Sequence, residues 1–400
     1  MTPKTIAFYN WIYPGGGAET VTRHLARFFS SHGYRCIVYT GKLADYALTP
    51  EDKKLTDIRV QPFYDHATRP ENTAFLIESL RVEKADYLIV QGNTDLPFAT
   101  IRSNTNCRVI FCLHNVPMWE IYFRKNRKSS EIRNPTLARR LEYILLRKPI
   151  YHLTRKLENR LLREYAEILP HVDRMVMLCP QYQYDMECML RKSGYPGSNA
   201  PTEKFTSLIN PLPPAKEPVR TEKKEKIVLY VGRLVKVHKR VDRLLKIWQR
   251  IEQLNPDWKL IIVGTGEEEI ELKKHAVQLG LQRAEFAGFH ADVSPFFRRA
   301  SFCCLTSNFE GLPMCLMEGQ QYGVIPVSFD SYAGIREITC DGECGIMVPA
   351  YSLRKYTTML SAALSDPDLQ ERMREGSYEA ARRYELERIG QQWLELFEQL

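Results

Sequence analysis

The sequence predicts an α/β protein with parallel sheets, and three observations support this prediction. Short apolar stretches at residues 5–10, 108–113, 260–263 and 302–305 have the length and composition of buried strands. Amphipathic patterns with helical spacing alternate with such stretches along the chain, and this alternation is typical of parallel sheets. The length of 400 residues suggests two domains, each large enough to bury its own core.

A proline-rich, charged segment at residues 213–226 has the composition of an interdomain linker. We therefore expect an N-terminal domain over residues 1–212 and a C-terminal domain over residues 227–384. The last helix is expected at residues 385–400. Its apolar face carries Ile389, Trp393, Leu396 and Phe397.

The most informative segment is residues 306–337, which follows the predicted strand 302–305. Pro313 suits the first turn of a helix, where its missing N–H costs nothing. We expect a strand, a tight turn that contains Glu310, and a helix with Glu318 in its second turn. Backbone N–H groups at the carboxyl end of a parallel strand bind anions, whereas carboxylates accept hydrogen bonds from sugar hydroxyls. Both features together suggest a nucleotide sugar as the ligand.

A basic turn follows the predicted strand that begins at Val228. It contains Gly232 and Arg233, and Lys239 comes six positions after the arginine. An arginine fork and a lysine point charge that converge would neutralise a diphosphate. We expect both cations to be exposed to a ligand. The alternative is a solvated basic turn without a ligand.

Three contiguous glycines, Gly15, Gly16 and Gly17, precede a helical pattern at residues 19–32. Glycines let the backbone approach a ligand closely and expose its N–H donors. The glycines are contiguous rather than spaced, so they do not form the dinucleotide-binding fingerprint. The alternative is a flexible loop.

Together these motifs resemble the donor-binding motifs of retaining glycosyltransferases with the GT-B fold, most closely glycosyltransferase family 4 (glycosyl transferases group 1). The resemblance rests on two glutamates eight positions apart, with Gly-Leu-Pro after the first and Gly-Val-Ile-Pro-Val after the second. The segment from Gly232 to Lys239 matches as well, except that Arg240 stands where the family usually has glycine. The resemblance implies two Rossmann-like, doubly wound domains that face a central cleft, with the last helix crossing back to the first domain.

The resemblance also implies roles for individual residues. His114, after the predicted strand 108–113, would lie beside the reacting carbon of the donor sugar, although a histidine at a strand end is more often an ordinary loop residue. Glu310 would hold hydroxyls of the donor sugar, and Glu318 would hold the ribose. The predicted catalytic residues are His114, Arg233, Lys239 and Glu310. The predicted donor-binding residues are Gly15, Gly16, Gly17, Gly232, Gly288, Phe289, Gly311, Leu312, Pro313 and Glu318.

Two further segments carry structural expectations. We interpret Gly264 and Gly266 as part of a pocket wall, and residues 209–212 as structural, near the hinge. No metal site and no cofactor are expected, because Arg233 and Lys239 would supply the charge that stabilises the leaving diphosphate.

The net charge of +8 is concentrated in residues 124–163. The basic residues there are Arg124, Lys125, Arg127, Lys128, Arg133, Arg139, Arg140, Arg147, Lys148, Arg155, Lys156, Arg160 and Arg163, and they alternate with leucines. We favour docking on an anionic membrane surface, because many members of the resembled family use lipid-linked acceptors. A solvated helical face and a site for an anionic acceptor are the alternatives. Nucleic acid is not expected, because no recognised module accompanies the charge.

The ten cysteines show no metal-ligand spacing; Cys303 and Cys304 are adjacent, and Cys340 and Cys344 are the next closest pair. The N-terminus is expected to enter a strand directly, without a signal peptide, and no apolar run is long enough to span a bilayer. We therefore expect reduced thiols and a cytoplasmic protein, peripheral on the inner face of the membrane.

The function expected from these residues is that of a retaining glycosyltransferase. It would move a sugar from a nucleoside diphosphate sugar to a hydroxyl of a glycan or lipid-linked glycan, in surface polysaccharide biosynthesis. One alternative is a nucleotide-sugar epimerase of the same fold, which would convert the donor without an acceptor. Another is a non-catalytic sugar- or membrane-binding module, which would bind the donor without turnover.

Overall fold

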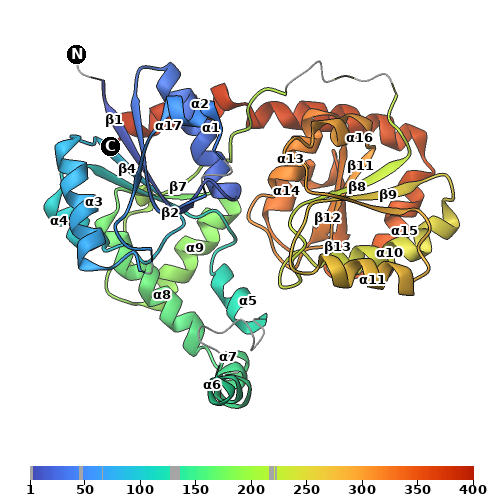
Figure 1. The fold of residues 1–400 in the computed structure, drawn as a ribbon, viewed down its shortest axis with the longest axis horizontal. Coiled ribbons are helices and arrows are strands. Elements are labelled where there is room, and N and C mark those ends of the chain that lie inside the picture. The colour runs from blue at the N-terminus through green and yellow to red at the C-terminus, as the bar shows by residue number, and fades with distance from the viewer. Residues whose placement is uncertain (1–2, 45–47, 65, 127–135, 216–219, 221–222) are drawn as a thin grey trace. The chain divides into compact units, whose positions relative to one another are not determined.

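The computed structural model describes residues 3–44, 48–64, 66–126, 136–215, 220 and 223–400 (Figure 1). The chain folds into two compact units. Unit 1 comprises Met1–Pro213 and Leu386–Leu400, and unit 2 comprises Pro214–Glu385. Each unit has a parallel sheet with helices on its faces, so the predicted α/β class is confirmed. No helix among these residues is long and apolar enough to cross a membrane.

The sheet of unit 1 has the strand order β3-β2-β1-β4-β5-β6-β7. Its strands are β1 (Thr5–Tyr13), β2 (Arg35–Leu43), β3 (Asp57–Val60), β4 (Tyr87–Gln91), β5 (Arg108–Cys112), β6 (Arg174–Met177) and β7 (Phe205–Ser207). Its main helices are α1 (Gly17–Ser31), α2 (Pro50–Leu55), α3 (Pro70–Val82), α4 (Phe98–Asn104), α5 (Trp119–Asn126), α8 (Lys156–Ile168), α9 (Pro180–Ser193) and α17 (Leu386–Glu398). The order reverses between β1 and β4, and ligands of such sheets bind beyond the carboxyl ends of the strands at this reversal.

The middle of the predicted basic region, residues 137–153, forms one helical run with a wider turn, while its described ends lie on α5 and α8. It consists of α6 (Leu137–Glu142), a π-helical turn (Tyr143–Arg147) and α7 (Lys148–Leu153). Three members of the predicted basic region lie outside the described residues: Arg127, Lys128 and Arg133.

The first strand is longer than the sequence predicts. It continues past Asn10 because Ile12 and Tyr13 pair with Lys42 and Leu43 of β2. Helix α1 in turn begins at Gly17, so the third glycine is helical and only Gly15 and Gly16 remain in the loop. The buried face of α1 agrees with the predicted pattern.

The C-terminal helix α17 packs within unit 1. Its predicted apolar residues are all buried. The ring of Phe397 stacks on Tyr87 with 4.1 Å between centroids, and Gly390 lies against the ring of Phe28. A Cβ at Gly390 would come within 2.5 Å of that ring, so the helix approaches α1 at a position where only glycine fits.

The sheet of unit 2 has the order β10-β9-β8-β11-β12-β13. Its strands are β8 (Ile227–Val231), β9 (Lys259–Val263), β10 (Ala284–Gly288), β11 (Phe302–Leu305), β12 (Ile325–Asp330) and β13 (Ile346–Pro349). Its helices are α10 (Val241–Leu254), α11 (Glu269–Gln278), α12 (Ser294–Arg299), α13 (Met314–Gln321), α14 (Gly334–Thr339), α15 (Leu353–Leu364) and α16 (Pro367–Ala381). Helices α10, α11 and α15 pack together on one face, and α13, α14 and α16 on the other (Figure 1). The order reverses between β8 and β11.

The expected linker, residues 213–226, is only partly described, because residues 216–219 and 221–222 lie outside the described part of the chain. Its end belongs to unit 2. The Nζ of Lys224 donates to the carbonyl oxygens of Phe297 (2.8 Å) and Arg298 (3.0 Å), and thereby caps α12. Burial lowers the pKa of Lys224 to about 7.

Candidate functional site

The loops that follow β8 and β11 are joined into one layer at the strand reversal of unit 2. The N–H of Asn308 donates to the carbonyl of His238 at 2.6 Å, and its side-chain amide donates to Val237 at 2.7 Å. The hydroxyl of Thr306 donates to the carbonyl of Arg240 at 2.9 Å. These bonds fix the segment that carries Lys239 against the segment that carries Glu310.

Lys239 and Glu310 form an ion pair in this layer, with 2.7 Å between Nζ and Oε1. The hydroxyl of Ser307 also donates to Oε1, at 2.6 Å. The two charged side chains are only 14% and 11% exposed, so the expectation that Lys239 is freely exposed is wrong. The reason is tertiary: pairing of β8 with β11 brings Glu310 onto the lysine.

The pair keeps both groups charged despite burial. Burial pushes the pKa of Lys239 down, but the Glu310 carboxylate outweighs this effect and the pKa ends above its usual value. Burial pushes the pKa of Glu310 up, but Lys239 and His238 outweigh it and the pKa ends below its usual value. Arg233, by contrast, is exposed as predicted. The site thus offers one accessible cation and one that is already engaged.

The backbone conformation at residue 240 explains why the resembled family has glycine at this position. Arg240 has φ +50° and ψ +46°, the left-handed conformation that glycine adopts without strain. Its guanidinium forks onto the carboxylate of Asp242, with distances of 2.8 and 2.9 Å. A bidentate ion pair therefore accompanies the strained backbone in this chain.

The turn after β11 and helix α13 have the predicted order. Pro313 is the N-cap of α13, and Glu318 lies in the second turn of the helix. Gly311, Leu312 and Pro313 are buried. The start of α14 presses on this turn, since a Cβ at Gly334 would come within 2.2 Å of the carbonyl oxygen of Gly311.

Glu318 is the second carboxylate of the motif. Its side chain is largely removed from solvent, and burial raises its pKa to about 7. The two glutamates therefore differ in charge state: Glu310 is ionised by its cation, and Glu318 titrates near neutral pH. Such separated pKa values are typical of functional sites.

Glycines on the neighbouring strand ends support the backbone of the Arg233 turn. A Cβ at Gly264 would lie 2.1 Å from the carbonyl oxygen of Gly232, and one at Gly266 would lie 2.4 Å from that of Leu234. The main chain of the Arg233 turn therefore lies directly against both glycines, and a pocket wall at this point stays a prediction. Gly288 accepts a hydrogen bond from the N–H of Gly264 at 2.7 Å, and Phe289 beside it is 73% exposed.

In unit 1, His114 follows β5 and belongs to a chain of polar side chains at the strand reversal. Its Nε2 bonds to Oε1 of Gln91, whose amide donates to the hydroxyl of Thr22 at 3.1 Å. Thr22 also bonds to Asn10. Because the Gln91 amide nitrogen donates to Thr22, its oxygen accepts from histidine, and this network assigns the proton of His114 to Nε2.

The ring of His114 is neutral in this setting. Burial lowers its pKa to about 4, although the side chain of Asn210 beside it acts in the opposite direction. Nδ1 is buried. A neutral, fixed imidazole suits positioning and polar contact rather than proton transfer near neutral pH.

Sequence reasoning missed four members of this arrangement, which are Asn10, Thr22, Gln91 and Asn210. Gln91 ends its apolar strand and Asn10 ends the apolar stretch within β1, and a polar side chain after such a stretch marks the carboxyl edge of a sheet. Asn210 was interpreted as purely structural, yet it lies beside His114. Gly15 and Gly16 are exposed at the end of β1, at the same edge.

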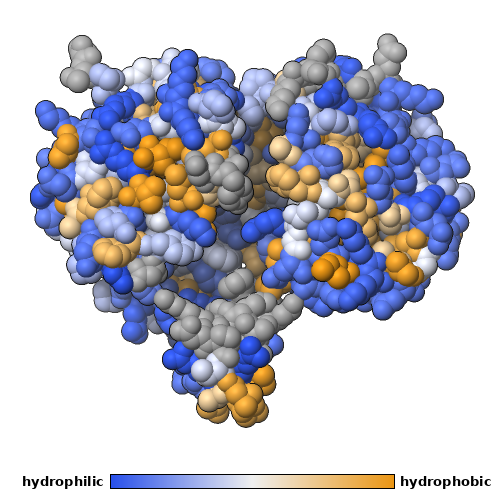
Figure 2. Space-filling view, in the orientation of Figure 1, coloured by the Kyte–Doolittle hydropathy of each residue, from blue (hydrophilic) through white to orange (hydrophobic). Residues whose placement is uncertain are grey.

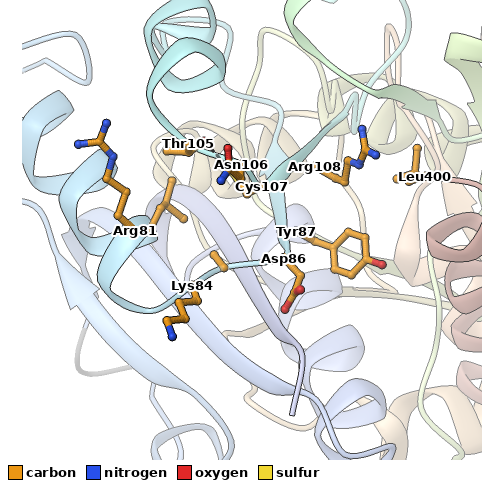
Figure 3. A pocket seen from close by; sticks show the side chains of 11 residues that line it. Arg81, Lys84, Asp86, Tyr87, Thr105, Asn106, Cys107, Arg108 and Leu400 are labelled. Carbon is orange, nitrogen blue, oxygen red and sulfur yellow. Dashed lines mark hydrogen bonds between the residues drawn. The ribbon is translucent and has the colours of Figure 1, made fainter. Parts of the chain in front are cut away.

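A cavity of about 440 Å³ lies elsewhere in unit 1, and Figure 3 shows its lining. It is formed where β4 and β5 begin, so it lies at the amino ends of the strands. Two of its charged side chains are engaged: Asp86 accepts from the N–H of Thr5 at 2.7 Å, and Arg108 pairs with Asp173 at 3.2 Å. No predicted site residue lines it. In the described part of the chain, no group of three His, Cys, Asp or Glu side chains is arranged to hold a metal ion.

Two doubly wound units, each with polar residues gathered at its strand reversal, define the class of GT-B glycosyltransferases. Solved structures share this fold. HepE of Anabaena, in complex with UDP and glucose, aligns over 99% of this chain and 100% of its own with a TM-score of 0.70 at 14% identity. WaaG, a glycosyltransferase involved in lipopolysaccharide biosynthesis, aligns over 98% and 99% with a TM-score of 0.67 at 19% identity.

The family follows from two sequence models. Residues 15–182 match the model of glycosyltransferase family 4, and residues 214–380 match that of glycosyl transferases group 1. The two models together cover most of both units. The chain belongs to this family, as the resemblance implied.

Individual relatives are more distant. An uncharacterized glycosyltransferase of Haemophilus influenzae is 31% identical over 195 residues, which is 48% of this chain and 54% of that protein. A Campylobacter jejuni α-1,4-N-acetyl-D-galactosaminyltransferase, named for an undecaprenol-diphosphate-linked glycan, is 26% identical over 173 residues, or 43% and 48% of the two chains. The chain thus spans about half the length of the curated relatives that it matches.

Proposed function

We propose that the protein transfers a sugar, with retention of configuration, from a nucleoside diphosphate sugar to a hydroxyl of a glycan or lipid-linked glycan acceptor in surface polysaccharide biosynthesis. The main observation in support is the buried Lys239–Glu310 pair beside the exposed Arg233, at the strand reversal of unit 2. The names of relatives point the same way: a structural neighbour binds UDP and glucose, and the Campylobacter relative acts on a lipid-linked glycan.

The ion pair suggests how the donor is engaged. A diphosphate that enters the site competes with Glu310 for the Nζ of Lys239, and Arg233 adds a second cation. Glu310, once its cation is shared, accepts hydrogen bonds from hydroxyls of the donor sugar. Glu318 binds the ribose. Lys239 and Glu310 therefore pair with each other before the donor binds. Once it is bound, Lys239 holds the diphosphate and Glu310 holds the sugar.

The bond between the anomeric carbon and the diphosphate breaks as the acceptor hydroxyl bonds to that carbon on the same face. The acceptor's proton passes to the leaving phosphate oxygen. Arg233, Lys239 and backbone N–H groups of the Gly311 turn stabilise the negative charge that develops on the diphosphate. His114, neutral and fixed by Gln91, positions the sugar. This arrangement differs from hydrolases with two opposed carboxylates.

The test begins with donor binding. Purified protein is screened for thermal stabilisation by a panel of nucleotide sugars, since a ligand at about 100 times its Kd adds about 2.7 kcal/mol. The stabilising donor is then assayed with and without glycan acceptors, and NMR reads the anomeric configuration of the product. Conversion of the donor without an acceptor would instead indicate an epimerase, and inversion would reject the retaining mechanism.

We further propose that the reaction needs no divalent metal, because two cations already face the diphosphate. Turnover should survive EDTA. Loss of turnover that manganese or magnesium restores would show that the two cations do not suffice.

A second part of the proposal concerns an anionic membrane surface. Six leucines and isoleucines between residues 137 and 150 of the α6–α7 run are exposed rather than packed in the core, and Figure 2 shows apolar side chains gathered in this part of unit 1. The exposed residues are Leu137, Leu141, Ile144, Leu145, Leu146 and Ile150. A helix that faces only water would not leave a row of apolar side chains exposed. The exposed leucines therefore favour insertion into a membrane, with the neighbouring cations bound to lipid headgroups.

Vesicle sedimentation tests this surface. The protein should sediment with anionic but not neutral vesicles, and less so as salt rises. A variant with Arg139, Arg140 and Lys148 changed to Glu should stay in the supernatant and keep its activity on a short soluble acceptor. The matched control reverses Lys246 and Arg250, exposed cations of α10 in unit 2. Impaired soluble turnover with weak vesicle binding throughout would assign the charges to an anionic acceptor.

A further inference from the structure

Two cysteines of unit 2 lie in contact at a kink between α14 and β13. The Sγ atoms of Cys340 and Cys344 are 2.8 Å apart. Cys344 is buried, with 2% of its surface exposed, whereas Cys340 is partly exposed, and both line a cavity of about 630 Å³. The Cys340 residue is therefore the more accessible of the two to a small reagent, with the second sulfur in contact with it.

A cation is fixed beside the exposed sulfur. The guanidinium of Arg383 lies 3.3 Å from Sγ of Cys340, and the same nitrogen donates to the carbonyl of Glu337 at 2.6 Å. A positive charge at this distance favours a thiolate, which is the reactive form of cysteine. Acidic Asp341 and Glu343 nearby act in the opposite direction.

The two thiols are unequal. A hydrogen bond from Cys344 lowers the pKa of Cys340 to about 7, with help from Arg383 and against burial. The same bond, together with burial, raises the pKa of Cys344. Cys344 thus keeps its proton and donates it in the hydrogen bond, and Cys340 is the stronger nucleophile of the two.

We propose that Cys340 and Cys344 form a reversible redox site, in which peroxide oxidises Cys340 and Cys344 closes a disulfide. The Cys340 thiolate attacks one oxygen of hydrogen peroxide, the O–O bond breaks, and the displaced hydroxide takes a proton to become water. The sulfur of Cys344 then attacks the Cys340 sulfenic acid, the S–O bond breaks, and a second water leaves with the thiol's proton. A thiol reductant returns both cysteines to thiols.

The backbone is already suited to the product. A disulfide bond is about 2.05 Å long, so the sulfurs need to approach by less than about 1 Å. Cys340 and Asp341 have left-handed conformations with φ of +49° and +54°, and they fold the chain back so that the two side chains meet.

The dithiol touches two elements of the candidate donor site. The amide of Gln320, two residues after Glu318 on α13, donates to the carbonyl of Ile338 at 2.8 Å and lies 3.6 Å from Sγ of Cys344. Helix α14 ends directly before Cys340 and begins at Gly334, against the Gly311 turn. The proposal therefore has a second part, which we call transmission: oxidation of the two cysteines moves these contacts and thereby changes the nucleotide affinity of the candidate donor site. This second part depends on the proposed function, and the first does not.

Mass spectrometry tests the site without any donor. The full-length protein is treated with hydrogen peroxide, and the peptide that contains both cysteines should lose two hydrogens and regain them in dithiothreitol. Cys344→Ser should instead accumulate a dimedone-trapped sulfenic acid at Cys340, and Cys340→Ser should react at neither position. Cys188→Ser, at a partly exposed cysteine of α9, is the matched control and should behave as wild type. Peroxide that leaves this peptide as a dithiol would overturn the site.

Two further readouts separate a reactive pair from two ordinary thiols. Alkylation of Cys340 should rise with pH through a midpoint of about 7, and Cys344→Ala should move this midpoint upward because alanine has no donor to replace the lowering hydrogen bond. Calorimetry with the nucleoside diphosphate of the donor that stabilises the protein should show an affinity change of about fivefold or more between reduced and oxidised protein. Equal affinities would overturn transmission, and failure of every nucleotide sugar of the panel to bind in either state would count against the proposed function instead.

Discussion

The strand reversals of the two units share a backbone design but treat charge in opposite ways. In unit 2, Lys239 and Glu310 lie 2.7 Å apart with little exposure, and both are ionised. In unit 1, Asn10 of β1, Thr22 of α1, Gln91 at the end of β4 and His114 after β5 form a chain of neutral hydrogen-bonding groups. The neutral groups bond to one another and carry no charge to offer, whereas an ion pair can exchange one partner for the anion of a ligand.

This difference teaches that the fold supplies the place and the side chains supply the chemistry. The charged pair suits stabilisation of a leaving diphosphate, because it is desolvated before the ligand arrives. The neutral chain suits orientation of a sugar. Substitutions in the two sets should therefore fail in different ways.

The largest effect is expected for Lys239→Ala. It removes a cation from the proposed diphosphate site and leaves Glu310 buried without it, so turnover should fall roughly 100-fold or more and the free energy of unfolding by about 3–5 kcal/mol. Urea denaturation and steady-state kinetics measure the two losses. The double variant Lys239→Met with Glu310→Met is the control: it should regain most of the stability and stay inactive. A double variant that regains turnover would show that the pair is only structural.

Arg233→Ala should separate catalysis from stability. The side chain is exposed, so the free energy of unfolding should change by no more than about 0.5 kcal/mol. Turnover should still fall roughly 100-fold, because the proposed diphosphate loses its accessible cation. Arg233→Lys, which keeps the charge but not the fork, should be intermediate. Kinetics close to wild type in the alanine variant would reject the role of Arg233.

Gln91→Leu breaks the neutral chain of unit 1. His114 and Thr22 lose a buried hydrogen-bond partner, which costs about 1–3 kcal/mol of stability. The loss in turnover should reflect mispositioning, with KM for the donor changed more than kcat. Gln91→Glu is the informative comparison, because a carboxylate should raise the pKa of His114 and add a pH-dependent step. Identical pH profiles in wild type and Gln91→Glu would contradict the assigned contact.

Glu318→Gln tests the second carboxylate through pH. The folded pKa of about 7 lies above the unfolded value of about 4.3. The unfolded state therefore ionises first, and the wild type loses stability as pH rises from about 4.3 to about 7, then stays level. Glu318→Gln has no carboxyl group to ionise, so it should not lose this stability. In urea denaturation, its free energy of unfolding relative to that of the wild type should therefore increase over this pH window. A constant difference from pH 4 to pH 8 would contradict the burial argument.

The two glutamates should also differ in nucleotide binding. Glu318→Gln should weaken binding of the bare nucleoside diphosphate, since its proposed partner is the ribose. Glu310→Gln removes the competitor for Lys239, so nucleotide affinity should be kept or increased while turnover with the full donor falls. Calorimetry with UDP distinguishes them, and equal weakening by both would reject this division.

The smallest effect is expected at Arg240. Both Arg240→Gly and Arg240→Ala lose the ion pair with Asp242, but only glycine relieves the left-handed conformation. The glycine variant should be more stable than the alanine variant by about 1 kcal/mol. Thermal unfolding of the two variants under one condition measures the difference, and the opposite order would show that backbone strain there is negligible.

The sequence by itself determined what depends on neighbours along the chain. The strand 302–305, the helix after Pro313 and the place of Glu318 in its second turn follow from local patterns and agree with β11 and α13. The buried face of α17 follows from helical periodicity in the same way. Strand and helix periods act over a few residues, so these features can be inferred without the rest of the fold.

The tertiary structure decided which side chains meet. Lys239 and Glu310 are 71 positions apart and form a pair only because β8 and β11 are neighbours in the sheet. Gln91 reaches His114 only across β4 and β5, and the length of β1 depends on its pairing with β2. The burial of Glu318, and with it the pKa of about 7, arises from packing by elements that no local pattern connects. Arg383, which helps Cys344 to lower the pKa of Cys340, is likewise brought there by the tertiary structure.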